Sequence, residues 1–250
     1  MTLTRTLCIA LLFLLATLQG CLAQTESENI KTKGIAATMT VVTKGAWGGS
    51  ADVKVTLRAG SGFGGTNIEL SSGDTLSVRA NGRSYRLSKH TDLFSVYYLA
   101  KVPEVYHNTE FVVSFNREED TSAPSSTTAL PEPFNITSEQ NQTYNYKDKI
   151  PIHWEPSQPR STMQLSYTLT CRQGSSSSLI VFTRGIPDSG SYNLNLHSHF
   201  ADEDPFDSCR GEATLNRRLA GTLDPNFGAG GSIMGIQERT LKFKLDMSDG

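Results

Sequence analysis

Residues 75–88 read Thr-Leu-Ser-Val-Arg-Ala-Asn-Gly-Arg-Ser-Tyr-Arg-Leu-Ser, and this stretch decides the fold class. Alternating apolar and polar residues flank Asn81-Gly82, the dipeptide that most strongly favours a two-residue type I′ turn. Such a turn sets Val78 opposite Tyr85 and gathers the apolar side chains of both arms on one face. The stretch therefore predicts a half-buried β-hairpin that turns two basic side chains outward, those of Arg79 and Arg86.

Segments with the same period of two recur on both sides of this hairpin. In the first half of the chain they fall at residues 35–43, 51–57, 66–70, 94–100 and 111–115. In the second half they fall at residues 150–154, 165–171, 192–196 and 241–247. The continuous apolar run 179–182 is typical of a buried strand. Because no segment after residue 20 predicts a helix convincingly, we expect an all-β fold.

A polar stretch divides these strands into two groups. Residues 118–133 are first acidic and then rich in Ser, Thr and Pro, which is typical of a linker. The segments on either side, 34–117 and 134–250, each hold enough short strands for a β-sandwich or a small barrel. We therefore expect two tandem β-sandwich domains, preceded by a tether over residues 21–33.

The second half also resembles a known family. Lys149-Ile-Pro-Ile-His-Trp154 and Leu165-Ser-Tyr-Thr-Leu-Thr-Cys171 are similar to the central strands of immunoglobulin-like and fibronectin-type domains. Asp188-Ser-Gly-Ser-Tyr192 is similar to the immunoglobulin tyrosine corner, although Leu194 stands where that family has its second Cys. The resemblance implies an Ig-like sandwich and a structural role for Tyr192. It implies no partner, because a fold does not fix a function.

The cysteines point to an oxidising compartment. Of the four, Cys8 lies in the N-terminal apolar segment and Cys21 lies at its end. Cys171 and Cys209 remain as an even pair, for which we predict a disulfide. No CxxC or Cys-His spacing typical of zinc is present.

The first 20 residues have the pattern of an export signal. An apolar run from Leu7 to Leu18 follows Arg5 and is too short to span a bilayer stably. Leu18-Gln19-Gly20-Cys21 then resembles the bacterial lipobox, and this resemblance implies removal of residues 1–20 and lipid chains on Cys21. Leu22 stands where inner-membrane lipoproteins carry Asp, so the implied location is the outer membrane of the cell envelope.

A second cleavage pattern leaves an alternative open. Cys21-Leu22-Ala23 is a small-x-small sequence that permits an ordinary cut after Ala23. That cut would release a secreted adhesion or receptor-like glycoprotein. The sequence offers two glycosylation acceptors for such a protein, Asn135-Ile-Thr137 and Asn141-Gln-Thr143.

The charge of the chain bears on two classes of partner, nucleic acids and anionic polysaccharides. The net charge of −2 provides no global basic field for a phosphate backbone, so we expect no nucleic-acid binding. Residues 30–117 nevertheless carry 11 basic and 6 acidic side chains. A modestly basic first domain, with Arg79 and Arg86 facing outward, could bind an anionic polysaccharide, although basic side chains that only solvate a small domain and discourage edge pairing explain the same charge slightly better. An envelope protein is the other candidate partner, next to the membrane held through the N-terminal lipid.

Two further groups of residues are candidates for binding. His197 and His199 would share one face of a strand and could begin a metal site near Asp202, Glu203, Asp204 and Asp207, although the polar face they continue favours solvent exposure. Trp47 and Phe63 lie in the glycine-rich loops 45–49 and 60–65, where an exposed aromatic ring could contact sugar or membrane, although a ring folded back over the edge of the core is the favoured interpretation. A strand separates these loops, so we do not expect a joint site.

No catalytic constellation stands out in the sequence. The Gly-x-Ser-x-Gly elbow, the His-Glu-x-x-His motif and a phosphate-binding glycine loop are all missing. We therefore expect a non-enzymatic cell-envelope lipoprotein without a cofactor, acting as a binding, assembly or structural module. The secreted glycoprotein is the first alternative, and a metal-dependent enzyme using His197 and His199 is the second.

Overall fold

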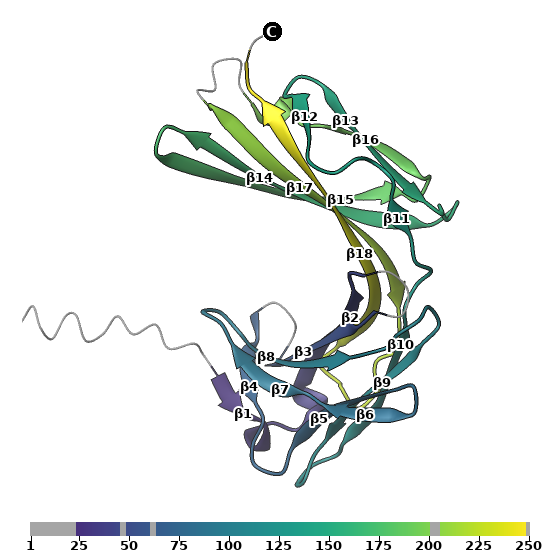
Figure 1. Cartoon of the computed structure of the whole chain (residues 1–250). Helices are drawn as coiled ribbons and strands as arrows, with labels where there is room; N and C mark the ends of the chain where they lie inside the picture. The colour runs from purple at the N-terminus through teal and green to yellow at the C-terminus, as the bar shows by residue number, and fades with distance from the viewer. Residues whose placement is uncertain (1–23, 46–48, 61–63, 201–205, 249–250) are drawn as a thin grey trace, which may run out of the picture.

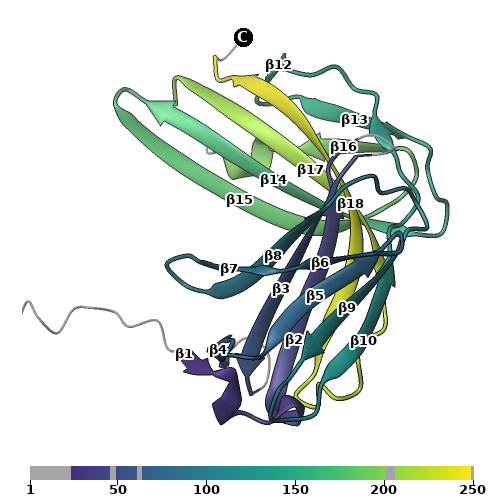
Figure 2. The same cartoon turned by 60° about the horizontal axis from the view of Figure 1, so that its bottom comes forward.

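The fold is all-β, as predicted. The structure, a computed structural model, describes residues 24–45, 49–60, 64–200 and 206–248 (Figure 1). Its regular elements within those ranges are strands and three single-turn 3-10 helices: η1 (Ser27–Asn29), η2 (Thr32–Gly34) and η4 (His197–His199). Figures 1 and 2 show two lobes arranged as a crescent that is open on one side.

One large sheet runs through both lobes. Its strand order is β1-β4-β3-β2-β18-β17-β14-β15, and β8, β7 and β12 pair with it at the side. The strands on the main path are β1 (Gln24–Glu26), β4 (Thr66–Glu69), β3 (Ala51–Ala59), β2 (Ile35–Thr43), β18 (Gly231–Asp246), β17 (Ser208–Ala220), β14 (Thr162–Gln173) and β15 (Ser176–Pro187). The side strands are β7 (Ser88–Thr91), β8 (Val96–Val102) and β12 (Gln142–Asn145).

Two smaller sheets back the large one and enclose two separate cores. The first-lobe sheet has the order β10-β9-β5-β6, formed by β10 (Ala123–Ala129), β9 (Glu110–Asn116), β5 (Thr75–Ala80) and β6 (Arg83–Arg86). The second-lobe sheet has the order β11-β13-β16, formed by β11 (Asn135–Ile136), β13 (Lys149–Glu155) and β16 (Ser191–Asn195). Buried apolar residues form one cluster in each lobe, so each lobe is sandwich-like.

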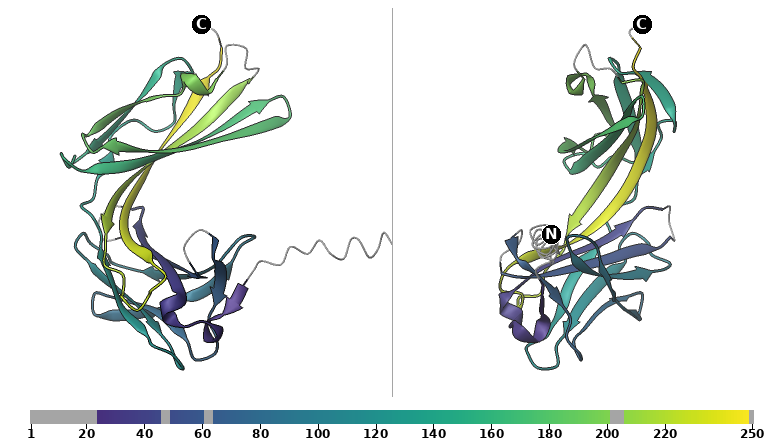
Figure 3. Two further views of the ribbon diagram at one scale, coloured as in Figure 1. Left: turned by 180° about the vertical axis from the view of Figure 1, so that it is seen from behind. Right: turned by 90° about the vertical axis from the view of Figure 1, so that its left-hand side faces the viewer.

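The long hairpin of β17 and β18 crosses from one lobe to the other (Figure 3). The first half of β18 pairs in parallel with β2, and Ile233 and Phe227 are buried in the first-lobe core. The second half of β18 contributes Leu241 to the second-lobe core. Residues that sequence reasoning assigned to a second domain thus complete the first lobe. The cause is a long-range parallel pairing, which leaves no local signal in the sequence.

The stretch 118–133, predicted to be a linker, contains strand β10, so this interpretation is wrong for residues 123–129. Ser126 is fully buried although it is polar, and its hydroxyl accepts a hydrogen bond from the backbone N–H of Asp224 at 3.1 Å. Gly221 lets the chain pass closely, because a Cβ there would lie 2.0 Å from Thr127 O. Small and hydroxylated residues therefore form a buried strand here through backbone pairing.

The predicted hairpin at 75–88 is confirmed in its turn and its register. Val78 pairs with Tyr85, and the backbone N–H of Leu87 donates to Leu76 O at 2.9 Å. Asn81 and Gly82 adopt φ values of 51° and 73°, as a type I′ turn requires.

The apolar run 179–182 was predicted as a buried strand, and this prediction is wrong. The run lies in β15, which pairs only with β14 and forms the edge of the large sheet. Leu179 and Val181 are 66% and 64% exposed. An apolar run cannot by itself distinguish a central strand from an edge strand, because both have the same composition.

The predicted disulfide between Cys171 and Cys209 is present. The two residues are directly opposite each other on β14 and β17, so the bond joins neighbouring strands of one sheet. This differs from the immunoglobulin family, where the bond links two sheets.

Removing this bond is expected to lower the free energy of unfolding by about 2–4 kcal/mol, because it closes a loop between residues 38 positions apart. The measurement is urea unfolding of the wild type and of the double variant Cys171→Ala/Cys209→Ala, with and without reductant. The wild type should lose stability in reductant, and the double variant should be insensitive to it. Equal stability of all samples would contradict the expectation.

Candidate functional site

The two candidate histidines lie in η4 and do not share a strand face, which corrects the expected geometry. Nε2 of His199 hydrogen bonds to the hydroxyl of Tyr167, whereas the ring of His197 packs against Tyr146 with ring centroids 6.2 Å apart. No group of three or more potential metal ligands occurs among the residues that the structure describes. Three of the nearby acidic residues, Asp202, Glu203 and Asp204, lie outside them.

Of the other candidate residues, the structure describes Arg79 and Arg86 of the first lobe. Arg79 and Arg86 are exposed on β5 and β6, as the hairpin register predicted. Both belong to the first-lobe sheet β10-β9-β5-β6, which backs the large sheet. Trp47 and Phe63 lie outside the described residues.

The tyrosine-corner motif has its main structural role at its first residue. Asp188 is buried and accepts hydrogen bonds from Trp154 Nε1 at 2.8 Å and from Arg217 Nε at 2.8 Å. Tyr192 is partly buried against the second-lobe core, and the guanidinium of Arg184 lies 5.8 Å from its ring centroid. These contacts stabilise the second-lobe sandwich.

Sequence reasoning missed a feature at the hairpin between β7 and β8. Leu93 and Phe94, here called the apolar tip, are 86% and 80% exposed. The sequence signal was the apolar pair between Asp92 and Ser95, but the predicted strand 94–100 absorbed half of it. Strand β8 in fact begins at Val96, which leaves both apolar residues in the turn.

The turn holds this pair in a defined conformation. Asp92 Oδ1 accepts hydrogen bonds from the backbone N–H groups of Phe94 and Ser95, at 2.9 and 2.8 Å. The backbone N–H of Asp92 donates in turn to Ser95 O at 3.0 Å. The hydrogen bond from the Phe94 N–H is the main cause that lowers the pKa of Asp92 below its usual range. The carboxylate therefore stays ionised, and able to accept both hydrogen bonds, to a lower pH than an ordinary Asp side chain.

The apolar tip is tied to the N-terminal strand of the described chain. Asn67 Nδ2 donates to Phe94 O at 3.3 Å, and Asn67 is the direct partner of Gln24 in the parallel pairing of β1 with β4. Gln24 Nε2 also donates to Glu69 Oε2 at 2.9 Å, and Glu69 forms an ion pair with Lys89 of β7. Figure 1 shows β1, β4, β7 and β8 on the open side of the first lobe.

A row of side chains extends from the tip along the same hairpin. His90 stacks on Tyr97 with ring centroids 5.7 Å apart, and the ammonium group of Lys54 lies 4.1 Å from the Tyr97 centroid. Beneath them, burial raises the pKa of Tyr98 to about 12. Its hydroxyl accepts a hydrogen bond from the backbone N–H of Leu70 at 2.8 Å, which ties β8 to the end of β4.

The tether predicted over residues 21–33 is wrong from Gln24 onward. β1 begins at this residue, Ser27 and Thr32 are buried, and the backbone carbonyl of Ser27 accepts a hydrogen bond from Arg117 Nη2 at 2.7 Å. The N-terminal segment is thus part of the first lobe, because polar contacts hold it where an apolar pattern is missing.

Two observations bear on how the chain relates to known proteins and to membranes. No family model and no curated protein sequence matches the chain. Within the described residues, no helix has the length and apolar character needed to cross a bilayer.

Proposed function

We propose that the chain is an exported, non-enzymatic binding or assembly module that lipid chains on Cys21 hold at the outer membrane of the cell envelope. The observation that carries this proposal is the docking of β1 at Gln24. Two residues, Leu22 and Ala23, separate Cys21 from Gln24, and each of the three steps along an extended chain covers at most about 3.6 Å. A lipid on Cys21 would therefore keep the folded body within about 10 Å of the bilayer.

The rest of the molecule supports a binding module better than an enzyme. Its buried ion pairs, Arg117 with Asp74 and Arg217 with Asp188, are enclosed in networks that hold chain segments together. Its exposed features include a basic hairpin face with Arg79 and Arg86 and a long sheet edge at β15. The basic face supports an anionic polysaccharide as ligand, and the sheet edge supports an envelope protein.

The anchor is tested by the intact mass of the mature protein purified from membranes. A lipidated Cys21 predicts a chain that begins at residue 21 and is heavier than its amino acids by more than one acyl chain, as stable attachment requires. Cys21→Ser should abolish the added mass and the partition into detergent. A conservative change at a neighbouring position, Leu22→Val, should alter neither. An unmodified chain that begins at Gln24 would overturn the lipid anchor.

A secreted glycoprotein is the second candidate, and a specific observation favours it. The side chains of Asn135 and Asn141, the two glycosylation acceptors, are both exposed. A cut after Ala23 would also keep all the described residues of β1, Gln24–Glu26, in the mature chain. The same mass measurement separates the candidates, since this one predicts a chain that begins at Gln24 and carries glycan mass.

A further inference from the structure

The apolar tip is an unusual feature for a protein surface. Leu93 and Phe94 are adjacent in sequence and are the two most exposed large apolar side chains among the described residues. Hydrogen bonds from the backbone N–H groups of Phe94 and Ser95 to Asp92 fix the backbone of the turn that presents both of them. Because exposed apolar pairs of this kind are costly in water, their position points to an apolar partner.

We infer that Leu93 and Phe94 insert into the surface of a lipid bilayer and form a second membrane contact beside the N-terminus. This inference rests on the proposed function only in that the anchor and the apolar tip would share one bilayer. It deepens that function, because it defines which face of the first lobe lies against the membrane.

The position of the N-terminal strand selects the bilayer over other apolar partners. Gln24 pairs with Asn67, whose side chain holds the carbonyl of Phe94. Cleavage before Cys21 or after Ala23 would therefore place the new N-terminus at most three positions before Gln24. The partner of Gln24, Asn67, is the residue that supports the apolar tip. With an anchor at Cys21, the bilayer surface lies within about 10 Å of Gln24. The lipid anchor alone would therefore bring the apolar tip to the bilayer, without a partner protein.

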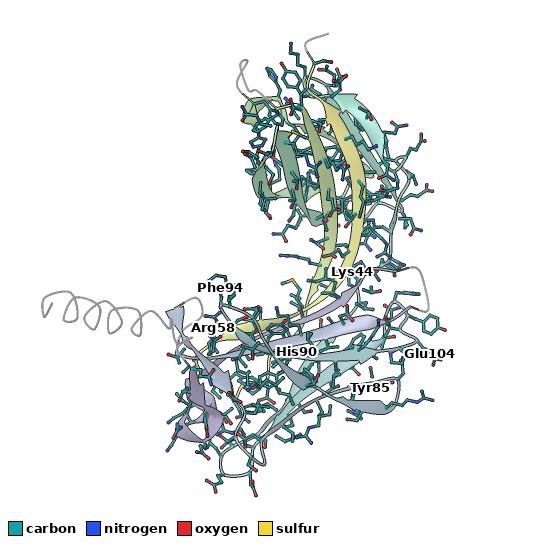
Figure 4. The ribbon with its side chains drawn as sticks, turned by 60° about the vertical axis from the view of Figure 1, so that its left-hand side comes forward. Lys44, Arg58, Tyr85, His90, Phe94 and Glu104 are labelled. Carbon is teal, nitrogen blue, oxygen red and sulfur yellow. A yellow bond between two sulfur atoms is a disulfide. The ribbon has the colours of Figure 1, made fainter. Side chains whose placement is uncertain are left out.

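The polar residues around the tip also fit a membrane surface. Arg58 is the direct strand partner of Asn67 and donates to Gly65 O, and Lys89 of β7 pairs with Glu69 of β4. Figure 4 shows Arg58 and Phe94 at the same corner of the first lobe. A guanidinium beside two inserted apolar side chains lies at the depth of lipid phosphate groups, where basic side chains are favoured.

The test separates the tip from the lipid anchor. The chain beginning at Gln24, exported behind an ordinary signal peptide, keeps every described residue and lacks Cys21. We expect it to float with vesicles of phosphatidylcholine. The double variant Leu93→Asp/Phe94→Asp should reduce its partition about 100-fold, because two buried apolar side chains are lost. Adding phosphatidylglycerol should strengthen wild-type binding by about fivefold, and Arg58→Ser should remove that gain.

The second lobe offers a matched control. Leu179→Asp/Val181→Asp also replaces two exposed apolar side chains, but these belong to β15 of the second lobe and not to the apolar tip. The partition of this variant should therefore stay within about twofold of the wild type. A Phe94→Trp variant gives an independent measurement, because its fluorescence should be quenched by brominated lipid, whereas that of Val181→Trp should not.

Each result has a definite meaning. Equal losses in the two double variants, or a Phe94→Trp signal that brominated lipid does not quench, would overturn the membrane tip. Absence of wild-type flotation would do the same and would leave an apolar pocket on a partner protein as the occupant. Loss of the anchor shows only in the intact mass, so the two proposals fail independently.

Discussion

Replacing Arg217 with alanine is expected to lower the free energy of unfolding by about 3–5 kcal/mol, because it leaves the buried carboxylate of Asp188 without its cation. Arg217 Nε and Nη2 donate to Asp188 at 2.8 and 3.0 Å. Its other hydrogen bonds go to backbone carbonyls, Nη1 to Glu132 O at 3.0 Å and Nη2 to Pro156 O at 2.8 Å. One side chain on β17 thus joins three separate segments near the junction of the lobes.

The neighbouring residue supplies the control for this prediction. Arg218 is exposed on the same strand, so Arg218→Ala should change the unfolding free energy by no more than about 0.5 kcal/mol. The measurement is the urea midpoint of both variants followed by circular dichroism. Similar midpoints for the two variants would mean that the Arg217 network contributes little to stability.

The same pair gives the protein a defined sensitivity to acid. Burial would raise the pKa of Asp188, but the hydrogen bonds from Arg217 and Trp154 outweigh it and hold the pKa below the usual value. A carboxyl with a depressed pKa contributes stability that is present above its unfolded pKa of about 3.9 and is lost as pH falls through its folded pKa. The stability difference between the wild type and Asp188→Asn should therefore shrink below about pH 4.

Local patterns in the sequence predicted the local parts of this fold. The Asn81-Gly82 turn fixes a register that depends on only a few neighbouring residues, and the structure has that register. Strand β2 matches its predicted bounds at residues 35–43, because alternation of period two is itself a local property. The disulfide could be predicted from the count of cysteines, since Cys8 and Cys21 fall in the predicted export signal and at its end, which leaves only one pair.

The parts that were mispredicted depend on partners far away in the chain. β18 continues to Gly231 because β2 lies beside it, and β10 is a strand because β9 and Thr222 complete its hydrogen bonds. Exposure of the 179–182 run follows from the position of β15 at the sheet edge, which composition does not encode. The apolar tip was missed for a similar reason, since only the start of β8 at Val96 shows that Phe94 is in a turn.

The segment that leads from the N-terminus into the first lobe depends on a second buried arginine. Arg117 Nε lies 2.6 Å from Asp74 Oδ2, and its Nη2 donates to Ser27 O at 2.7 Å. Both terminal nitrogens also donate to Ile30 O at 3.2 Å. Ser27 Oγ donates to Asp74 at 2.6 Å, so the ion pair and the N-terminal segment form one network. This network holds β1 in the position that places Gln24 beside the apolar tip.

Arg117→Ala should therefore remove about 3–5 kcal/mol of stability, because Asp74 stays buried without its cation, and should release the segment before β2. Trypsin is the sensitive probe of that release, since Lys31 and Lys33 are exposed within the segment. Cleavage there should become much faster in Arg117→Ala, whereas Arg79→Ala, which removes an exposed arginine of the same lobe, should leave the rate unchanged.

The result also bears on membrane attachment. A lipid on Cys21 would still hold Arg117→Ala at the bilayer, but the released segment would no longer keep the apolar tip near the anchor. Quenching of Phe94→Trp by brominated lipid should then fall to the level found for the unanchored chain that begins at Gln24, while the protein remains in the detergent phase. Slow cleavage after Lys31 and Lys33 together with undiminished quenching would show that β1 stays docked without Arg117, and that β4 alone determines where the N-terminus lies.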